Sequence, residues 1–226
     1  VSTSHSSERT LTDTHTQLAQ YAKNENVILI RIATPLGFSH AVNTGMHSVN
    51  ADYYILLNQD TAQAPSAESI NWVTHLIEWM EYRPLCGIAG AKLLRDDGYI
   101  QHIGMDDLWH HRHYGESPTI PEVSYYKKLQ AVTGAVFAIK AEVLSQVGFF
   151  NETYKFGCED VEFCHRAATR GGWETWYVPT AELLHYDGAI RRANSKESTR
   201  IKAWGATGDG KFMVDWYPYI RRCHDE

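Results

Sequence analysis

The sequence predicts an α/β protein built on a mixed, mostly parallel β-sheet flanked by helices. Helical and strand-like segments alternate along the first half of the chain, and the strand-like segments are apolar throughout. Strands that are apolar on both faces are typical of a sheet covered by helices on both sides. The chain of 226 residues, 43% hydrophobic and 21% charged, is long enough for one or two domains with an ordinary core.

Three helix-to-strand steps make up this first half. In each, apolar residues recur at helical spacing and a short apolar run of strand length follows. The predicted helices span residues 8–24, 37–49 and 66–82, and the strands that follow them span 26–32, 52–57 and 86–91. In such sheets ligands bind beyond the carboxyl ends of the strands, so the residues that follow 52–57 are candidates for a site.

The second half of the chain is less regular. A turn at Asp97-Gly98 between two short extended runs predicts a hairpin over residues 93–103. A polar, aromatic loop over 104–123 follows, and long irregular segments inside compact domains are more often functional than decorative. The remaining predictions are strands at 129–139, 173–178 and 182–185 and helices at 141–147 and 159–169, before the pattern weakens into a polar tail.

Composition excludes several classes of protein. With 21 Lys and Arg against 27 Asp and Glu, the chain lacks the basic excess that nucleic-acid binding requires. Its apolar runs are too short to span a bilayer and no signal peptide precedes them, so we expect a cytoplasmic protein, with peripheral attachment to a membrane left open. The cysteines are not at disulfide spacings and are expected to be reduced; they are Cys86, Cys158, Cys164 and Cys223.

Two adjacent carboxylates, Glu159 and Asp160, stand where a loop becomes a predicted helix. The positive end of a helix dipole favours ionised carboxylates, and an ionised carboxylate can accept a proton. The alternative is that both acids serve the first turn of the helix without touching a substrate. Cys164 falls on the apolar face of this helix, so we interpret it as a core residue rather than a nucleophile.

A second acidic element, Asn58-Gln59-Asp60, directly follows the strand at 52–57. A carboxylate at that edge of the sheet can join a hard divalent cation to a diphosphate. The alternative is a turn that ends the strand, with Asp60 capping the next segment. His185 ends the last predicted strand and can also ligate a metal, although a single histidine is more often structural.

The irregular loop contains a cluster of imidazoles, His110, His111 and His113. A zinc site is one interpretation, but no second Cys/His pair lies at ligand spacing, so a solvated or substrate-facing loop is preferred. Trp109 in this loop and Trp173 beyond it offer flat surfaces on which a sugar could stack, and aromatic residues fill cores equally well.

Several motifs follow one another in order along the chain. They are Gly37-Phe-Ser-His-Ala-Val-Asn43-Thr-Gly45, Tyr54-Ile-Leu-Leu-Asn-Gln-Asp60-Thr, Val132-Thr-Gly134-Ala-Val-Phe, and Val147-Gly-Phe-Phe-Asn-Glu152 followed by Glu159-Asp160-Val-Glu-Phe-Cys-His-Arg166 and Gly171-Gly172. Their combination resembles the family 2 glycosyltransferases with the GT-A fold, especially the rhamnosyl- and galactofuranosyltransferase-like branch. The resemblance implies a Rossmann-like GT-A domain over residues 1–188 and a tail over 189–226 that packs on it or extends from it.

The resemblance also implies an activity: inverting transfer of a sugar from a UDP-, dTDP- or GDP-sugar to a hydroxyl of a glycan or lipid-linked acceptor. Asp160 would be the catalytic base with Glu159 as its support, and Asp60 and His185 would bind Mn²⁺ or Mg²⁺. The remaining residues on the nucleotide-sugar side would be Asn43, Asn58 and Gln59. Those on the acceptor side would be Thr133, Gly134, Trp109 and Trp173.

The chain departs from the family pattern on the nucleotide side. Family members begin with a strand that helps to hold the base and has no counterpart here, and Asn58 replaces the first Asp of the metal motif. A sheet without that strand would expose its edges, which favours a fragment or a larger parent protein over an altered pocket. Two other functions stay open: a degenerate GT-A module that binds a sugar or a protein without catalysis, and an unrelated α/β metal hydrolase that uses the histidine-rich loop.

Overall fold

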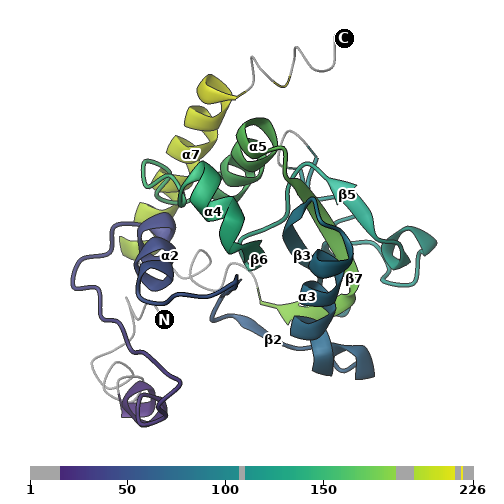
Figure 1. Cartoon of the computed structure of the whole chain (residues 1–226), viewed down its shortest axis with the longest axis horizontal. Coiled ribbons are helices and arrows are strands. Elements are labelled where there is room, and N and C mark those ends of the chain that lie inside the picture. The colour runs from purple at the N-terminus through teal and green to yellow at the C-terminus, as the bar shows by residue number, and fades with distance from the viewer. Residues whose placement is uncertain (1–15, 107–109, 187–195, 217–219, 221–226) are drawn as a thin grey trace.

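The computed structural model describes residues 16–106, 110–186, 196–216 and 220. Its strands are β1 (Tyr53–Leu57), β2 (Thr61–Gln63), β3 (Cys86–Leu94), β4 (Ile100–His102), β5 (Lys127–Leu129), β6 (Val136–Lys140) and β7 (Glu174–His185). They form one seven-stranded sheet in the order β1-β6-β3-β7-β2, with β4 paired to β3 and β5 paired to β7 (Figure 1). The hairpin predicted over residues 93–103 is therefore confirmed as the antiparallel pair of β3 and β4.

Helices flank this sheet, as predicted (Figure 1). They are α2 (Phe38–His47), α3 (Trp72–Tyr82), α4 (Ala141–Val147), α5 (Glu159–Gly171) and α7 (Lys196–Asp215), with 3₁₀ turns at Ala67–Asn71 and Pro121–Ser124. Helix α3 packs Leu76 and Met80 into the apolar cluster on one face of the sheet. Helices α4 and α5 pack into a second cluster on the other face, so both faces of the central strands are covered.

The prediction of a mixed sheet is confirmed, but the balance of strand directions differs from the prediction. The described strands form six pairings. The pairing of β3 with β7 is parallel, and the other five are antiparallel. The segments predicted as strands at 173–178 and 182–185 are one continuous strand, β7. Conversely, the strand predicted at 129–139 is divided, because residues 130–135 leave the sheet between β5 and β6.

The strand predicted at 26–32 is wrong. Residues 27–32 are not paired with any described strand, and Ile28 keeps 60% of its surface exposed. An apolar run becomes a strand only when a partner supplies hydrogen bonds and covers its side chains. The composition of this run therefore indicates β propensity, whereas pairing depends on the rest of the fold.

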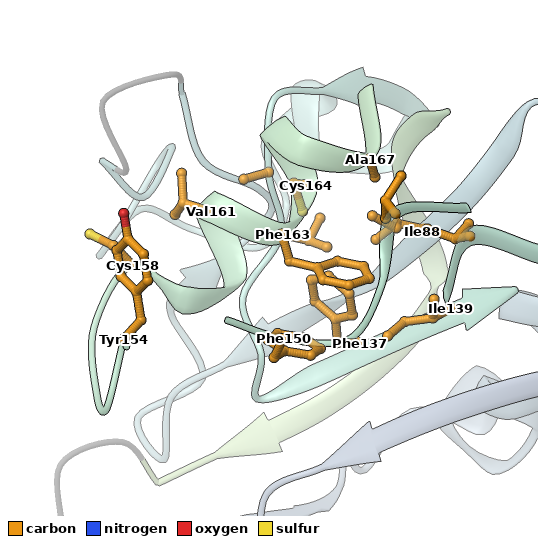
Figure 2. Close-up of a cluster of buried hydrophobic side chains, with 14 of the residues drawn as sticks. Ile88, Phe137, Ile139, Phe150, Tyr154, Cys158, Val161, Phe163, Cys164 and Ala167 are labelled. Atoms are coloured by element: carbon orange, nitrogen blue, oxygen red, sulfur yellow. The ribbon is translucent and has the colours of Figure 1, made fainter. Parts of the chain in front are cut away.

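The larger apolar cluster positions the start of α5, which carries the two adjacent carboxylates. Figure 2 shows its three phenylalanine rings: Phe150 and Phe163 are stacked with centroids 4.5 Å apart, and Phe137 meets both edge-on. Cys164 is fully buried in the same cluster, which confirms its interpretation as core. It is a free thiol, as are Cys86 and Cys158, while Cys223 lies outside the described residues.

Helix α7 was not predicted, because its glycines disfavour a helix in isolation. Tertiary packing explains one of them: a Cβ on Gly208 would come within 2.3 Å of the carbonyl oxygen of Gly157. Further along α7, Phe212 is fully buried, and Tyr154 donates a hydrogen bond to Asp215. The helix thus packs over the loop that leads into α5.

No helix in the described part of the chain combines the length and apolarity needed to cross a membrane.

Candidate active site

A chain of contacts links the predicted metal-binding residues to the predicted base. Asp60, after β1, faces His185 at the end of β7, and His185 contacts Gln101 on β4. The next residue of β4, His102, accepts a hydrogen bond from the backbone of Thr133. Gly134, next to it, donates to Asp160 at the start of α5. The fold therefore brings into one region residues that lie as far apart in the sequence as Asp60 and His185.

Asp60 and His185 form the cation-binding half of this region. The side-chain oxygen of Gln101 lies 2.9 Å from His185 Nδ1; because that oxygen can only accept, it selects the tautomer with the proton on Nδ1. His185 Nε2 is then left with a lone pair. It is buried, has no hydrogen-bond partner among the described residues, and lies 3.2 Å from Asp60 Oδ1.

A divalent cation fits these two residues. A carboxylate oxygen beside an imidazole lone pair provides two ligands, and a metal-binding histidine usually donates its other N–H to a nearby acceptor, as His185 does to Gln101. The described residues contain no group of three or more His, Cys, Asp and Glu side chains that could hold a metal by themselves. Oxygens of a bound diphosphate and water would have to complete the shell, as is usual for Mg²⁺.

Asn58 and Gln59 form the turn that leads from β1 to Asp60. The backbone N–H of Asn58 donates to Ala135 at 2.9 Å, and its carbonyl accepts from the backbone and the hydroxyl of Thr61. The turn that was considered as an alternative is therefore present, and it also aims Asp60 at His185. Gln59 is exposed on the surface of this turn.

Two backbone amides hold the carboxylate of Asp160. Gly134 N–H donates to Oδ2 and Val161 N–H to Oδ1, each at 2.8 Å. A Cβ on Gly134 would lie 3.2 Å from the ring of Phe38 and 3.7 Å from Asp160 Cβ, so glycine allows this close approach. Burial raises the pKa of Asp160 above its ordinary value, and the two N–H groups oppose that rise by stabilising the ionised form.

Glu159 is the less stabilised member of the pair. Its side chain is buried, and Oε2 has no hydrogen-bond partner within the described part of the chain. Burial and then the neighbouring charge of Asp160 raise the pKa of Glu159 to about 8. Two adjacent carboxylates, one buried and one partly buried, with such different hydrogen bonding favour one ionised and one protonated group.

This pair predicts a dependence of stability on pH. Because the folded-state pKa of Glu159 is raised from 4.5 to about 8, the folded protein holds a proton that the unfolded chain releases within that window. Stability from this group is therefore present below about pH 4.5 and declines toward pH 8. We expect Glu159→Gln to remove that decline, which amounts to about 3–4 kcal/mol, measured by urea unfolding from pH 5 to 8. Exposed Glu78→Gln is the control, and parallel pH profiles for wild type and Glu159→Gln would contradict the prediction.

Other predicted site residues lie elsewhere or have structural partners. Asn43 accepts from the backbone of Phe150 and donates to its carbonyl and to Glu152, so it ties α2 to the loop before α5. Trp173 stands at the start of β7, the opposite end from His185, and donates to Gln146. The structure does not bring Trp173 to Asp160, and Trp109 lies outside the described residues.

The histidine cluster separates into different contacts. His110 Nδ1 lies 3.2 Å from Asp106, and His113 Nδ1 lies 3.2 Å from Glu116. His111 turns instead toward His102. These separate contacts do not resemble the shared tetrahedral site that zinc requires.

Sequence reasoning missed Gln101 and His102, which link the two halves of the site. The available signal was a pair of polar residues between Ile100 and Ile103 in an otherwise apolar hairpin strand. In the structure both are buried, at 4% and 0% exposure, which requires that their polar atoms be bonded within the fold.

The sheet, its helices and this edge define the class of protein: the fold is that of the GT-A glycosyltransferases. The crystal structure of GalNAc-T7 with UDP, GalNAc and Mn²⁺ matches 80% of this chain and 36% of its own, with a TM-score of 0.58 and 18% identity. The mannosyltransferase PcManGT of Pyrobaculum calidifontis, in complex with GDP-Man and Mn²⁺, also has this fold. The match covers 94% of this chain and 53% of the mannosyltransferase, with a TM-score of 0.58 and 15% identity. The chain belongs to the glycosyltransferase-like family 2, whose model matches residues 1–206.

Curated relatives agree with this assignment. An uncharacterised protein of Sinorhizobium fredii is 30% identical over 183 residues, covering 74% of this chain and 19% of the relative. The O-antigen biosynthesis protein RfbC of Myxococcus xanthus is 24% identical, and the match covers 71% of this chain and 13% of the relative. The N-acetylglucosaminyl-diphospho-decaprenol L-rhamnosyltransferase of Mycobacterium tuberculosis is 22% identical, and the match covers 76% of this chain and 62% of the relative. The chain thus spans less than two thirds of the length of these relatives.

Proposed function

We propose that this chain is a metal-dependent, inverting glycosyltransferase domain that moves a sugar from a nucleotide-sugar to a hydroxyl of a glycan or lipid-linked acceptor. The observation that carries the proposal is the chain of contacts from Asp60 and His185 to Asp160. A carboxylate beside an imidazole lone pair and a second, oriented carboxylate in one region support this proposal, because a displacement at a sugar carbon with an anionic leaving group needs a cation and a base.

Asp160 is the proposed base. Its two backbone hydrogen bonds orient the carboxylate, and burial raises its pKa, which makes it a better proton acceptor than an exposed Asp. It would take the proton of the acceptor hydroxyl as that oxygen attacks the anomeric carbon. Glu159, protonated in its buried position, would stay neutral beside it and avoid a second adjacent charge.

Asp60 and His185 would hold Mn²⁺ or Mg²⁺ together with diphosphate oxygens of the nucleotide-sugar. When bound, such a cation neutralises the charge that develops on the departing nucleoside diphosphate. The structural neighbours were solved with UDP or GDP-mannose and Mn²⁺, which supports a nucleotide-sugar as the substrate. We propose a UDP-, GDP- or dTDP-sugar. Asn58 and Gln59 would contact the nucleotide-sugar from the turn before Asp60, and Asn43 would act on the same side by positioning α2.

Thr133 and Gly134 would line the acceptor side, because their backbone lies directly against Asp160 and His102. The names of two relatives, an O-antigen biosynthesis protein and a rhamnosyltransferase acting on a lipid diphosphate, support an acceptor in bacterial surface polysaccharide. We propose that this domain acts in the cytoplasm, at the surface of a membrane that holds a lipid-linked acceptor.

The nucleotide half is tested by calorimetric titration of UDP, GDP and dTDP with and without MnCl₂. We expect one nucleotide to bind measurably only with Mn²⁺, and Asp60→Asn to weaken that binding about 10- to 100-fold because a ligand loses its charge. Asp97→Asn, in the exposed turn between β3 and β4, is the matched control and should bind as wild type does. Mn²⁺-independent binding, or none, would instead support a module that has lost catalysis.

A further inference from the structure

Two histidines that the proposed mechanism does not use lie in contact beside Asp160. His102 on β4 is fully buried, whereas His111 in the loop over 104–123 is exposed. Their Nδ1 atoms are 3.1 Å apart, and their rings meet edge-on with centroids separated by 5.0 Å. The pair therefore extends from the core to the surface of the site.

The hydrogen bonds of His102 determine where its proton lies. Burial, followed by the neighbouring His111 and His185, lowers the pKa of His102 well below its ordinary value, so its ring is neutral and carries one proton. Thr133 N–H donates to Nε2 at 3.1 Å, so Nε2 must carry the lone pair. The proton is therefore on Nδ1, the less common tautomer of a free imidazole.

This tautomer of His102 determines which ring nitrogen of His111 carries its proton. The Nδ1–H of His102 points at His111 Nδ1, which has to accept and cannot carry a proton of its own while the contact lasts. His111 is then held as the neutral tautomer with its proton on Nε2. That atom is on the far side of the ring from His102.

His111 lies near Asp160 and near the backbone segment before Thr133. It lies close enough to Asp160 that a positive charge on its ring would lower the pKa of that carboxyl. Its backbone bridges to Met105, which bridges in turn to Ala131, shortly before Thr133 and Gly134. Both histidines are thus attached to the backbone segment that lines the acceptor side of Asp160.

We propose that His111 contacts the acceptor sugar and that His102 is its positioning residue. Buried His102, locked by Thr133 N–H into its Nδ1–H tautomer, holds His111 so that its Nε2–H donates to a sugar oxygen in front of Asp160. This inference rests on the proposed glycosyltransferase function. A neutral, oriented N–H beside the base would align the attacking sugar without adding a charge that weakens the base.

The tautomer is tested without any substrate. Long-range ¹H–¹⁵N spectra of the ¹⁵N-labelled protein, with His102 assigned by comparison with His102→Asn, should show a protonated Nδ1 and an unprotonated Nε2. The His111 signals should show the opposite tautomer and should shift in His102→Asn. A protonated Nε2 on His102 would overturn the proposal, because Thr133 N–H could not then donate to it.

Activity separates the role of each ring. Transfer from UDP-, GDP- and dTDP-sugars to a panel of octyl glycosides should fall about 10- to 100-fold in His111→Leu, with part of the rate recovered in His111→Gln, which retains an N–H at similar reach. Binding of the nucleotide with Mn²⁺ should change less than about twofold, since His111 is assigned to the acceptor side. Equal loss of nucleotide binding and of transfer would overturn that assignment.

Two substitutions of His102 distinguish positioning from general support of the fold. Asn retains a donor near the place of Nδ1, whereas Gln retains an acceptor near the place of Nε2 for Thr133 N–H. We expect His102→Asn to retain more transfer than His102→Gln, whichever of the two melts at the higher temperature. Activity that simply follows melting temperature would reject a positioning role. A wild-type protein with no turnover on any probe would overturn the glycosyltransferase function and the acceptor contact, while the spectra would still decide the histidine pairing.

Discussion

Asp160→Asn is expected to reduce glycosyl transfer by about 10²- to 10⁴-fold, the usual contribution of a general base. The amide cannot accept the proton of the acceptor hydroxyl. It also turns an NH₂ group toward one of the two N–H groups, Gly134 or Val161, that hold the native carboxylate. The measurement is the initial rate of sugar transfer under saturating Mn²⁺ and nucleotide-sugar.

A control is needed to separate chemistry from folding in this experiment. Binding of the nucleotide with Mn²⁺ should persist in Asp160→Asn, because Asp60 and His185 are untouched. Asp97→Asn should transfer sugar at the wild-type rate, since Asp97 pairs with Arg95 on the surface of the β3–β4 turn. Unchanged transfer by Asp160→Asn would show that another group is the base or that none is required.

Arg166→Met is expected to cost about 3–5 kcal/mol of stability, the largest structural effect predicted for this chain. Arg166 on α5 is buried. Its guanidinium donates hydrogen bonds to both carboxylate oxygens of Glu162, from Nε at 2.8 Å and from Nη2 at 3.0 Å. Its other N–H groups donate to the carbonyls of Val147 and Phe149. The substitution would leave a buried, uncompensated carboxylate and two carbonyls without these donors. It would also loosen α5 from the preceding loop.

Thermal or urea unfolding measures this effect, with a decrease in melting temperature of roughly 10 °C expected for a chain of this size. Arg170→Met on the exposed side of the same helix is the control and should cost less than about 0.5 kcal/mol. The double substitution Glu162→Leu with Arg166→Met should recover much of the loss, because no charge is then left buried. If Arg166→Met is no more destabilising than Arg170→Met, the buried pair does not hold α5 as described.

Local patterns in the sequence predicted most helices and several strands, because these depend on near neighbours. Apolar spacing located α3, α4 and α5, and the Asp97-Gly98 turn located the hairpin of β3 and β4. Prediction was wrong at residues 26–32, where β propensity was present but none of the described strands pairs with the segment. It also missed α7, in which Gly208 is accepted because it packs against the loop before α5 rather than because glycine favours a helix.

For the site, the sequence alone indicated the candidate residues: two acids where a loop enters a helix, an acid after a strand, and a histidine at the end of another. These residue types are recognisable from their place in each element. Their arrangement depends on the tertiary structure, since the β3–β4 hairpin brings Gln101 to His185 and His102 to Thr133. Hydrogen bonds and burial between distant segments select tautomers and raise carboxyl pKa values, and neither can be inferred from neighbours along the chain.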